Sequence, residues 1–439
     1  MLIGIDDTDS DEGMCTTYLA AVLAEELKIF GTVVGFPYLI RLNPTIPYKT
    51  RGNAALGIEI VLKNDDLKTK ADLVSFVSNK IRESAEISCE KTNPGAVFIF
   101  EDAYDSLRRP LNDFFKKAVT SVIEIEEAKL LLKMFESKNE NSVYQFSMKN
   151  GRGLIGALAV CGAVLNQEWE ETYEYLAYRF CLKRKENLKR VVDRGSLILA
   201  DQETTPETWD TIDYSKKTKP FPVCVPAGKD PVLFGIRGNS PEAVNAAAEF
   251  VISEEIERFQ IFKTNQGTDA HLILVNSVSE MKPLHSYILN GIVFSKSETI
   301  EGGHDIFKLK DADENLLTCA AFEPTGDFRH VIRDLIPRDE ICVFGSFKNE
   351  TFNLEKIKIK KLAEIYETGN PICSVCEKRM KSAGIGQGFR CQKCKTKADE
   401  KVEIKVSRKI NIGYYEVPPS ARRHLSKPLI RYSKEELEK

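Results

Sequence analysis

The sequence predicts a multi-domain protein of the α+β class that combines an N-terminal α/β domain, a second α+β module, a small β-barrel and a zinc ribbon. Its 439 residues are too many for one hydrophobic core and should divide into about three or four domains. Apolar strands alternate with amphipathic helices in the first part of the chain. Short strands joined by polar turns follow, and paired Cys-x2-Cys motifs lie near the end. These three patterns predict distinct modules in sequence.

The composition is that of a water-soluble globular chain, with 42% hydrophobic and 29% charged residues and a net charge of −3. No apolar run reaches the length of a membrane span, and the first residues lack the pattern of a secretory signal. We therefore expect a cytoplasmic protein with no membrane partner. Eleven cysteines in such a chain indicate metal binding or buried thiols rather than a disulfide framework.

The first module, residues 1 to about 102, shows an alternation of strands and helices that is compatible with a sandwich of ferredoxin-like connectivity. Apolar periodicity predicts strands at 2–5, 33–42, 54–62 and 96–100, and helices at 16–28 and 70–86. A helical connector follows, with 125–135 as its clearest piece.

A second module is predicted from about 143 to 263. The pattern indicates a strand at 143–148, a helix ending at 165, strands at 172–180, 191–199 and 231–238, a helix at 241–251 and a last strand ending at 262. Residues 201–230 form a long polar stretch. This stretch is a substrate loop, a mobile lid or a disordered insertion, and the sequence does not distinguish among these alternatives.

The third module has the element order of an OB barrel, which is three strands, a helix and two more strands. The strands are predicted at 287–294, 305–309, 316–322, 340–347 and 354–362, with the helix at 328–335. Barrels of this type bind oligonucleotides through aromatic and basic side chains on one face. The phenylalanines of this region could serve that purpose or fill the barrel.

The strongest isolated motif is a pair of Cys-x2-Cys sequences separated by fourteen residues, formed by Cys373, Cys376, Cys391 and Cys394. Four thiolates at this spacing suit one tetrahedral Zn²⁺ and leave no open position, so the metal should be structural. Eleven lysines or arginines against four acids lie between residues 395 and 434. This basic end suggests a nucleic-acid contact, although a solvated charged surface is the common alternative.

An acidic turn follows the first predicted strand. Asp6, Asp7 and Asp9 lie where this strand leads toward the helix that begins near Thr16 and Thr17. Such turns are ligand sites in α/β folds: carboxylates hold Mg²⁺, and helix N-terminal amides bind phosphate oxygens. The structural alternative is a capped turn, because Asp, Ser and Thr are preferred helix caps. Three carboxylates within four residues repel one another unless a cation or donors lie among them, which favours the ligand site.

A cationic segment, residues 41–54, is predicted to form the other half of this site. Lys49 and Arg51 alternate along an extended stretch, so that both side chains lie on one side, and Gly52 permits close backbone approach. Paired cations opposite carboxylates and Mg²⁺ suit a triphosphate. A solvated surface loop is the alternative.

The segment Gly151-x-Gly153-x-x-Gly156 matches a dinucleotide fingerprint, but no doubly wound pattern surrounds it. We interpret its glycines as close packing or as a phosphate or substrate turn, with Arg152 as a candidate contact. A phosphatase of the haloacid-dehalogenase type is disfavoured. Asp7 and Asp9 satisfy its first two positions, but Asp11 stands where that motif has Thr or Val.

Together, the segments 4–9, 13–19, 41–53, 151–157 and 172–179 and the barrel and four-cysteine modules resemble one family, the archaeal tRNA-isoleucine 2-agmatinylcytidine synthetases. The resemblance covers nearly the whole chain in the same order. It implies five regions: a kinase-like ATP- and Mg²⁺-binding catalytic domain at 1–130, a ferredoxin-like domain at 131–265, an OB fold at 284–366, a zinc ribbon at 371–400 and a basic C-terminal tail at 401–439.

The resemblance also implies an activity. The substrates would be ATP, agmatine and an isoleucine tRNA with a wobble cytidine. ATP would be consumed to AMP and phosphate, the 2-carbonyl oxygen of the cytosine would be phosphorylated, and agmatine would displace that phosphate. The modified tRNA would then read AUA. The required cofactors would be ATP, Mg²⁺ and a structural Zn²⁺.

Carried onto this chain, the resemblance gives its residues candidate roles. The candidate catalytic residues are Asp6, Asp7, Asp9 and Thr16, of which Asp7 and Asp9 would bind Mg²⁺ and Thr16 would be autophosphorylated. The candidate phosphate contacts are Thr8, Thr17, Lys49, Arg51, Gly52 and Asn53. The candidate substrate contacts are Arg152, Gly153 and Arg237, with Asp210 or Asp213 for the guanidinium of agmatine.

Two other functional classes stay open from the sequence. A noncatalytic tRNA-binding protein would use the barrel and the ribbon, with the acidic turn as a structural cation site. A nucleotide phosphohydrolase would use the N-terminal module alone.

Overall fold

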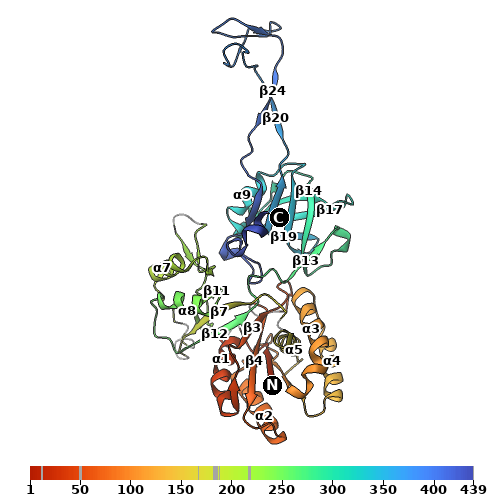
Figure 1. The fold of residues 1–439 in the computed structure, drawn as a ribbon, viewed down its shortest axis with the longest axis vertical. Coiled ribbons are helices and arrows are strands. Elements are labelled where there is room, and N and C mark those ends of the chain that lie inside the picture. Colours follow the sequence, from red (N-terminus) through yellow and green to blue (C-terminus); the bar gives the residue numbers. More distant parts are fainter. Residues whose placement is uncertain are drawn as a thin grey trace.

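The protein is described from a computed structural model, which covers residues 1–10, 13–48, 52–166, 168–180, 186, 188–215 and 219–438. Figure 1 shows an elongated molecule: the N-terminal module lies at one end, a β-barrel lies in the middle, and a thin two-stranded stalk carries a small ribbon at the other end. No helix in the described part of the chain combines the length and apolar character that crossing a bilayer requires.

A ten-stranded sheet forms the base of the molecule, in the order β6-β5-β1-β4-β3-β12-β7-β11-β8, with β2 paired to β4. Its first half consists of β1 (Leu2–Asp6), β2 (Gly31–Val33), β3 (Tyr38–Arg41), β4 (Ala54–Leu62), β5 (Gly95–Ile99) and β6 (Val143–Ser147). The expected strand at 33–42 is therefore two strands. The strand at 143–147 extends the sheet at the edge of β5.

Helices cover both faces of this half. The helices α1 (Thr16–Glu26) and α2 (Leu67–Ser84) share one core with Ile3 and Ile5 of β1. On the other face, α3 (Tyr104–Thr120), α4 (Ile125–Lys138) and α5 (Gly153–Asn166) share a core with Leu2. The side chains of a strand alternate between its faces, so an apolar run such as 2–5 can serve both cores at once.

The second half of the sheet joins the first through a parallel pairing of β12 with β3, in which Thr264 lies opposite Leu39. It contains β7 (Thr172–Tyr178), β8 (Thr208–Trp209), β11 (Val232–Gly238) and β12 (Arg258–Thr264). The helices α7 (Arg194–Thr204) and α8 (Pro241–Glu249) pack beside it (Figure 1). One sheet thus runs through both modules.

The expected strand at 191–199 is wrong, because α7 occupies most of this segment. The side chain of Asp193 caps the helix by accepting a hydrogen bond from the Ser196 amide at 2.7 Å. Leu197 and Ala200 then lie one turn apart and are both buried. The apolar residues after Asp193 therefore follow the helical repeat.

The polar stretch 201–230 contains regular structure in its described part. It includes the end of α7, the short strand β8 and a two-stranded ribbon of β9 (Ile212–Asp213) and β10 (Phe221–Pro222). Its end, near Asp230, lines a cavity that is described below. This position favours the substrate-loop interpretation over a disordered insertion.

The middle module is a closed five-stranded barrel of β14 (His285–Val293), β16 (Asp305–Lys310), β17 (Leu316–Ala321), β18 (Glu340–Lys348) and β19 (Thr351–Lys361). The ring closes through the pairing of β14 with β16. The helix α9 (Phe328–Arg333) lies between the third and fourth of these strands in sequence. The predicted element order of this module is confirmed. The short strands β13 (Leu272–Val275) and β15 (Glu298–Thr299) extend its edges.

A stalk of β20 (Ile365–Gly369) and β24 (Val402–Val406) carries the ribbon, whose strands are β21 (Lys381–Ser382), β22 (Phe389–Arg390) and β23 (Lys397–Ala398). Arg408 fixes the base of the stalk to the barrel by donating to both carboxylate oxygens of Asp339, each at 2.8 Å. Bidentate pairs of this kind fix orientation as well as distance.

The chain then returns across the barrel as a segment that we call the C-terminal clamp, residues 413–438. Its strand β25 (Gly413–Glu416) pairs with β19, and it ends in the short helix α10 (Lys434–Glu438). Leu425 is buried in the core formed by α3 and α5. The clamp therefore joins the barrel to the N-terminal module.

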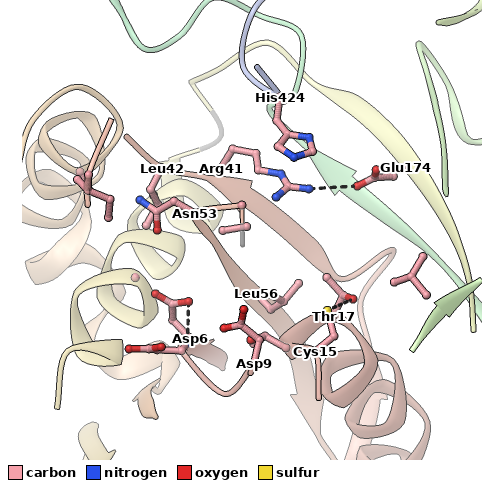
Figure 2. A pocket seen from close by; sticks show the side chains of 18 of the residues that line it. Asp6, Asp9, Cys15, Thr17, Arg41, Leu42, Asn53, Leu56, Glu174 and His424 are labelled. Carbon is pink, nitrogen blue, oxygen red and sulfur yellow. Dashed lines mark hydrogen bonds and ion pairs between the residues drawn. The ribbon is translucent and has the colours of Figure 1, made fainter. Parts of the chain in front are cut away.

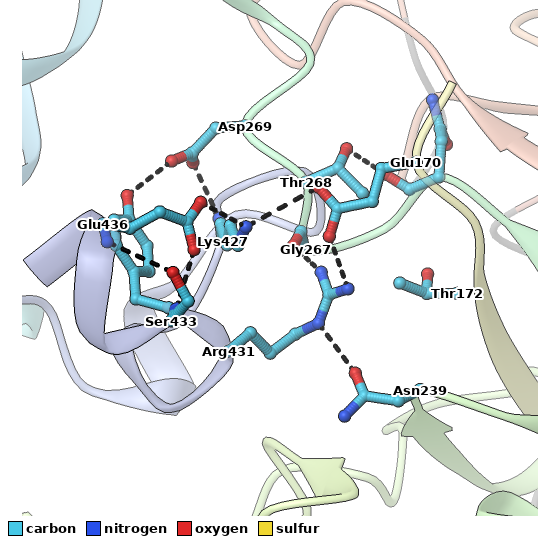
Figure 3. A network of polar contacts seen from close by, with 12 residues as sticks. Glu170, Thr172, Asn239, Gly267, Thr268, Asp269, Lys427, Arg431, Ser433 and Glu436 are labelled. Carbon is cyan, nitrogen blue, oxygen red and sulfur yellow. Dashed lines mark hydrogen bonds and ion pairs between the residues drawn. The ribbon is translucent and has the colours of Figure 1, made fainter. Parts of the chain in front are cut away.

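Ion pairs hold the clamp in place. Arg431 contacts Glu170, Asn239 and the carbonyl of Gly267, and Lys427 contacts Glu170 (Figure 3). The side chains of Arg422, Arg423, Lys427 and Arg431 are all engaged inside the protein, and Arg422 pairs with Asp210 and Glu416. These four side chains therefore help to hold the clamp in place, and a nucleic-acid contact of the basic tail stays a prediction.

Replacing Arg422 by methionine is expected to destabilise the protein, because both Arg422 and Asp210 are 5% exposed and the change leaves the buried Asp210 carboxylate with only the longer contact to Arg237, at 3.9 Å. Breaking such a pair costs about 3–5 kcal/mol. The apparent melting temperature of the full chain should fall. The double variant Arg422→Met/Asp210→Asn should recover part of the loss. Lys405→Met, which breaks an exposed pair with Glu364, is the control and should cost less than about 1 kcal/mol. An equal fall in the melting temperatures of Arg422→Met and Lys405→Met would contradict a structural role of the Arg422 pair in the clamp.

Candidate active site

A cavity of about 370 Å³ lies where the acidic turn, the segment after β3, the start of α5, strands β7 and β11 and the C-terminal clamp meet (Figure 2). Its walls come from segments that are far apart in the sequence. Asp6, Asp9, Cys15 and Thr17 lie at one end of the view, and Arg41, Glu174 and His424 lie at the other. The cavity therefore has a carboxylate end and an arginine end.

The carboxylate end is formed by Asp6, Asp7 and Asp9, directly after β1. The Asp6 carboxylate accepts a hydrogen bond from the Asp7 amide at 2.7 Å. Asp7 adopts a left-handed backbone conformation, with a φ of 58°, and its carboxylate accepts from Arg152 Nε at 2.9 Å. A non-glycine residue in this conformation is unusual and is often found at functional sites.

Burial changes the acidity of both buried carboxyl groups. It raises the pKa of Asp6 well above its ordinary value, and the neighbouring charge of Asp7 adds to this effect. Burial also raises the pKa of Asp7 to about 7, against the opposing effect of Arg152. When carboxylates lie close together and have raised pKa values, a cation that binds among them stabilises their charged forms.

The N-terminus of α1 lies beside these carboxylates. The Thr8 hydroxyl donates to the Thr16 hydroxyl at 3.1 Å, and the Cys15 thiol lies 3.0 Å from the Thr17 hydroxyl. Thr16 and Thr17 line the cavity, whereas Thr8 is fully buried behind them. Helix N-terminal amides and two hydroxyls thus face the space next to the carboxylates, an arrangement suited to phosphate oxygens.

The glycines of the 151–156 motif permit close packing. A Cβ on Gly156 would lie 2.0 Å from a carboxylate oxygen of Asp6, and one on Gly153 would lie 2.6 Å from the Asp6 carbonyl oxygen. Gly153 is buried in this contact and does not line the cavity, so its expected role as a substrate contact is not supported by its position. Arg152 does line the cavity. The motif therefore brings α5 against the acidic turn.

The arginine end contains Arg41, Glu174, Arg237 and His424. The Glu174 carboxylate contacts Arg237 Nε at 3.2 Å and Arg41 at 3.8 Å, and also accepts from Gln266 at 2.7 Å. Burial lowers the pKa of Arg41 to about 10, although Glu174 opposes the shift. Two arginines around one carboxylate leave a net positive charge at this end.

The cationic segment reaches the cavity through Gly52 and Asn53, which both line it. The side-chain amide of Asn53 donates a hydrogen bond to the backbone carbonyl of Asn43 at 3.0 Å and connects the two ends of the segment. Lys49 and Arg51 lie outside the described residues, so their expected contact with phosphates stays a prediction.

The carboxylates expected to bind agmatine lie elsewhere. Asp210 is buried between Arg422 and Arg237, and Asp213 accepts from the amides of Ser215 and Ser420. Neither lines the cavity. The guanidinium site predicted there is not supported, because both groups already hold the C-terminal clamp. Sequence position alone could not distinguish a clamp contact from a ligand contact.

Among the charged residues and histidines that line the cavity, four were missed by sequence reasoning: Arg41, Glu174, Asp230 and His424. Arg41 and Glu174 lie at strand positions, where a charged residue that faces a covered sheet is a useful signal. His424 forms no ligand spacing with another histidine and carries no local signal. Its place depends on the path of the C-terminal clamp.

The ribbon brings its four cysteines together as predicted, and their ligand atoms all lie within 4.8 Å of one another. The sulfur atoms of Cys373 and Cys394 are 3.2 Å apart, far beyond a disulfide bond of about 2.05 Å. Backbone amides of Val375 and Cys394 lower the pKa values of Cys373 and Cys391, respectively. This donor set fits a closed, structural zinc site. Among the described residues, the aspartates form no such cluster of metal ligands.

The architecture defines a class of protein: a multi-domain enzyme whose catalytic cavity, built on a mixed sheet, is joined to a closed barrel and a zinc ribbon. Matches to protein-family models narrow this class to one family. The TiaS TCKD domain matches residues 2–146, the TiaS FLD domain matches 151–271, and the TiaS C-terminal zinc ribbon domain matches 370–410. The chain belongs to the TiaS family, the 2-agmatinylcytidine synthetases of isoleucine tRNA.

Relatives agree over the full length. The isoleucine-tRNA 2-agmatinylcytidine synthetase TiaS from Methanosarcina mazei is 51% identical over 438 residues, which cover 100% of this chain and 99% of the relative. The apo form of TiaS, an isoleucine-tRNA agmatidine synthetase, matches with a TM-score of 0.87 and 45% identity, over 99% of this chain and 98% of that chain. A complex of TiaS with isoleucine tRNA, AMPCPP and agmatine matches with a TM-score of 0.82 and 43% identity over the same shares. The family resemblance seen in the sequence is confirmed.

Proposed function

We propose that this protein is an ATP-dependent ligase that attaches agmatine to the 2-carbon of the wobble cytidine in isoleucine tRNA. The observation that carries this proposal is the full-length match to a solved TiaS complex that contains isoleucine tRNA, AMPCPP and agmatine. The cavity adds the chemistry: it places carboxylates, hydroxyls and helix amides at one end and arginines at the other.

The 2-carbonyl oxygen of cytosine is a poor leaving group, and phosphorylation converts it into a good one. The 2-carbonyl oxygen of cytosine attacks a phosphorus atom of ATP, a phosphoanhydride bond of ATP breaks so that the rest of the nucleotide leaves, and the oxygen becomes part of a phosphate ester. The primary amine of agmatine then attacks C2, and the C2–O bond breaks as phosphate leaves with the former carbonyl oxygen. The attacking amine loses a proton in the same step. The cavity must therefore hold ATP, the flipped-out cytosine and the cationic agmatine side by side.

The carboxylate end is the proposed site of phosphoryl transfer. Asp7 and Asp9 are the proposed Mg²⁺ ligands, with Asp6 and Thr16 next to them, and Mg²⁺ would neutralise the phosphate charge that develops during transfer. The pairing of Asp7 with Arg152 supports this role, because it shows that the site favours a positive charge at this carboxylate. Thr17, Gly52 and Asn53 line the adjacent wall and are proposed phosphate contacts.

The remaining parts of the fold suit a large RNA substrate. We assign the kinase-like domain to the first half of the sheet, the ferredoxin-like domain to the second half and an OB fold to the barrel. The order of the barrel strands and the helix between its third and fourth strands support the OB assignment. The barrel and the zinc-bound ribbon would bind the tRNA while the anticodon base enters the cavity. A cytoplasmic location follows from this function.

Asp230 is the proposed partner of the agmatine guanidinium, because it is a carboxylate that lines the cavity at the end of the 201–230 stretch. Asp230→Asn keeps the oxygen that accepts from the Val232 amide at 2.8 Å but removes the charge. We expect the KM for agmatine to rise about 10- to 100-fold, since a charge-assisted hydrogen bond contributes about 1.5–3 kcal/mol. Asp213→Asn, outside the cavity, is the control. A raised KM only in the Asp213 variant would overturn the assignment.

The function is tested by incubating the purified protein with ATP, agmatine and unmodified isoleucine tRNA. AMP release and the mass of the wobble nucleoside are then followed. A mass gain equal to agmatine minus water, dependent on all three substrates, is expected. Tight tRNA binding without a mass change would favour the noncatalytic RNA-binding alternative. ATP hydrolysis that does not depend on RNA would favour the phosphohydrolase.

A further inference from the structure

Three consecutive residues of the C-terminal clamp, Arg422, Arg423 and His424, each contact a different part of the protein. Arg422 pairs with Asp210, which belongs to the module of β7 and β11. Arg423 pairs with Glu355 of the barrel at 3.0 Å. His424 lines the active-site cavity. This short stretch is therefore the point where the barrel, the sheet and the cavity meet.

His424 contacts the cavity residue Arg237 directly, with its Nδ1 atom 2.8 Å from a terminal guanidinium nitrogen. A guanidinium only donates hydrogen bonds, so Nδ1 must be the acceptor. The histidine is then neutral, with its proton on Nε2, because an imidazolium has no acceptor. The contact thus defines one protonation state and one ring orientation.

Arg237 is held from three sides. Its Nε donates to Glu174 at 3.2 Å, a terminal nitrogen meets His424, and Asp210 lies 3.9 Å away. The carboxylate of Asp210 is shared with Arg422. Two residues of the clamp therefore act on Arg237, one directly and one through a shared carboxylate. An arginine held in this way loses little further freedom when it meets a substrate.

The same stretch reaches the cationic segment. Arg423 donates to the Pro44 carbonyl at 3.2 Å and to the Ser346 hydroxyl of the barrel at 2.8 Å. A Cβ on Gly52 would lie 3.2 Å from His424 Nε2, which shows how closely the ring approaches the far end of that segment. A shift of the barrel would therefore change both sides of the arginine end of the cavity.

We propose that His424 is a positioning residue for the ligase reaction: it holds Arg237 in the cavity and makes this arrangement depend on the docking of the barrel through the C-terminal clamp. This inference rests on the proposed function. In physical terms, the protein completes its active site with a residue from the segment that fastens the tRNA-binding half to the catalytic half. Arg237 then meets the substrate in place only when the two halves are docked.

The test compares three substitutions of His424 in the full-length, zinc-bound protein. In His424→Asn, the side-chain oxygen can take the place of Nδ1 and accept from Arg237. In His424→Gln, the polar end reaches the place of Nε2 instead, and His424→Ala removes both positions. The kcat and KM of agmatine conjugation, the Kd for tRNA and the melting temperature are measured for each variant and for the wild type.

We expect His424→Ala and His424→Gln to lose about 10- to 100-fold in kcat/KM, the effect typical of groups that orient a functional side chain, with the Kd for tRNA unchanged. His424→Asn should recover most of the activity. Equal activity in all variants would overturn the proposal, and so would an activity loss that follows the melting temperature or the tRNA Kd rather than the position of the acceptor. A wild-type protein without conjugation would refute the proposed function itself.

Discussion

Replacing Asp7 by asparagine is expected to abolish agmatine conjugation while tRNA binding is retained. The substitution keeps the size of the side chain and removes the charge that we assign to Mg²⁺. Removing one preorganised electrostatic contact of a transition state costs about 10²–10³-fold in kcat. The tRNA contacts proposed for the barrel and ribbon are distant from this carboxylate. The loss should therefore appear in kcat, measured by AMP release and nucleoside mass.

The same substitution should stabilise the ligand-free protein. The pKa of Asp7 is raised by burial to about 7 in the folded state, whereas an unfolded aspartate has a pKa of about 3.9. Between these two values the folded state binds more protons than the unfolded state, so stability falls as the pH rises through this window. Above about pH 7 the charged Asp7 costs up to about 4 kcal/mol relative to its neutral form.

The check is a pair of melting curves recorded from pH 5 to pH 8 without nucleotide. The melting temperature of the wild type should fall more steeply with pH than that of Asp7→Asn, and the variant should be the more stable at pH 8. Asp72→Asn, on the exposed side of α2, is the control for a change in net charge. A variant that is less stable than the wild type at pH 8 would show that the pairing with Arg152 outweighs the burial of the charge.

Removal of zinc is expected to unfold the ribbon and weaken tRNA capture, but to leave the cavity intact. The ribbon strands β21, β22 and β23 are only two residues long, and its core contains Cys373 and Cys391 together with Met380 and Phe389. Such a module has too little apolar surface to fold alone, and zinc binding supplies about 10–16 kcal/mol in comparable domains. The affinity for tRNA should fall at least about tenfold, which corresponds to a loss of about 1.4 kcal/mol of contacts.

Cys376→Ser tests the same point without a chelator, and Cys89→Ser, a thiol outside the cluster, is its control. The tRNA Kd is measured by filter binding and the affinity for ATP by calorimetry. ATP binding should be unchanged, because the stalk separates the ribbon from the catalytic sheet (Figure 1). Unchanged tRNA affinity in the zinc-free protein would remove the assigned role of the ribbon.

Much of the fold and part of the site were predicted from local sequence patterns. The acidic turn after β1, the helix that begins at Thr16 and the four-cysteine cluster lie where the sequence places them, because each depends on residues close together in the chain. The barrel strands also follow from local alternation. The segment 191–199 was predicted as a strand, whereas Asp193 caps the helix α7 that begins at the next residue.

Long-range contacts could not be read in this way. The 151–156 glycines suggested a ligand turn or close packing, and only the approach of α5 to Asp6 showed that Gly153 and Gly156 pack. Asp210 suggested a ligand carboxylate, but it is paired with Arg422 from the far end of the chain. In both cases the residue type indicated possible roles, and only the residue that it contacts in the folded protein showed which role it has.

The sequence by itself therefore determined the family, the module order, the zinc ligands and the carboxylate end of the cavity, since these features are encoded in contiguous motifs. The tertiary structure decided that one sheet runs through two modules, that basic residues of the tail lock the halves together, and that Arg41, Glu174, Arg237 and His424 meet at one end of the cavity. The physical reason is that the energy of a charged side chain depends on its partner and its burial. Both are determined by how distant segments pack.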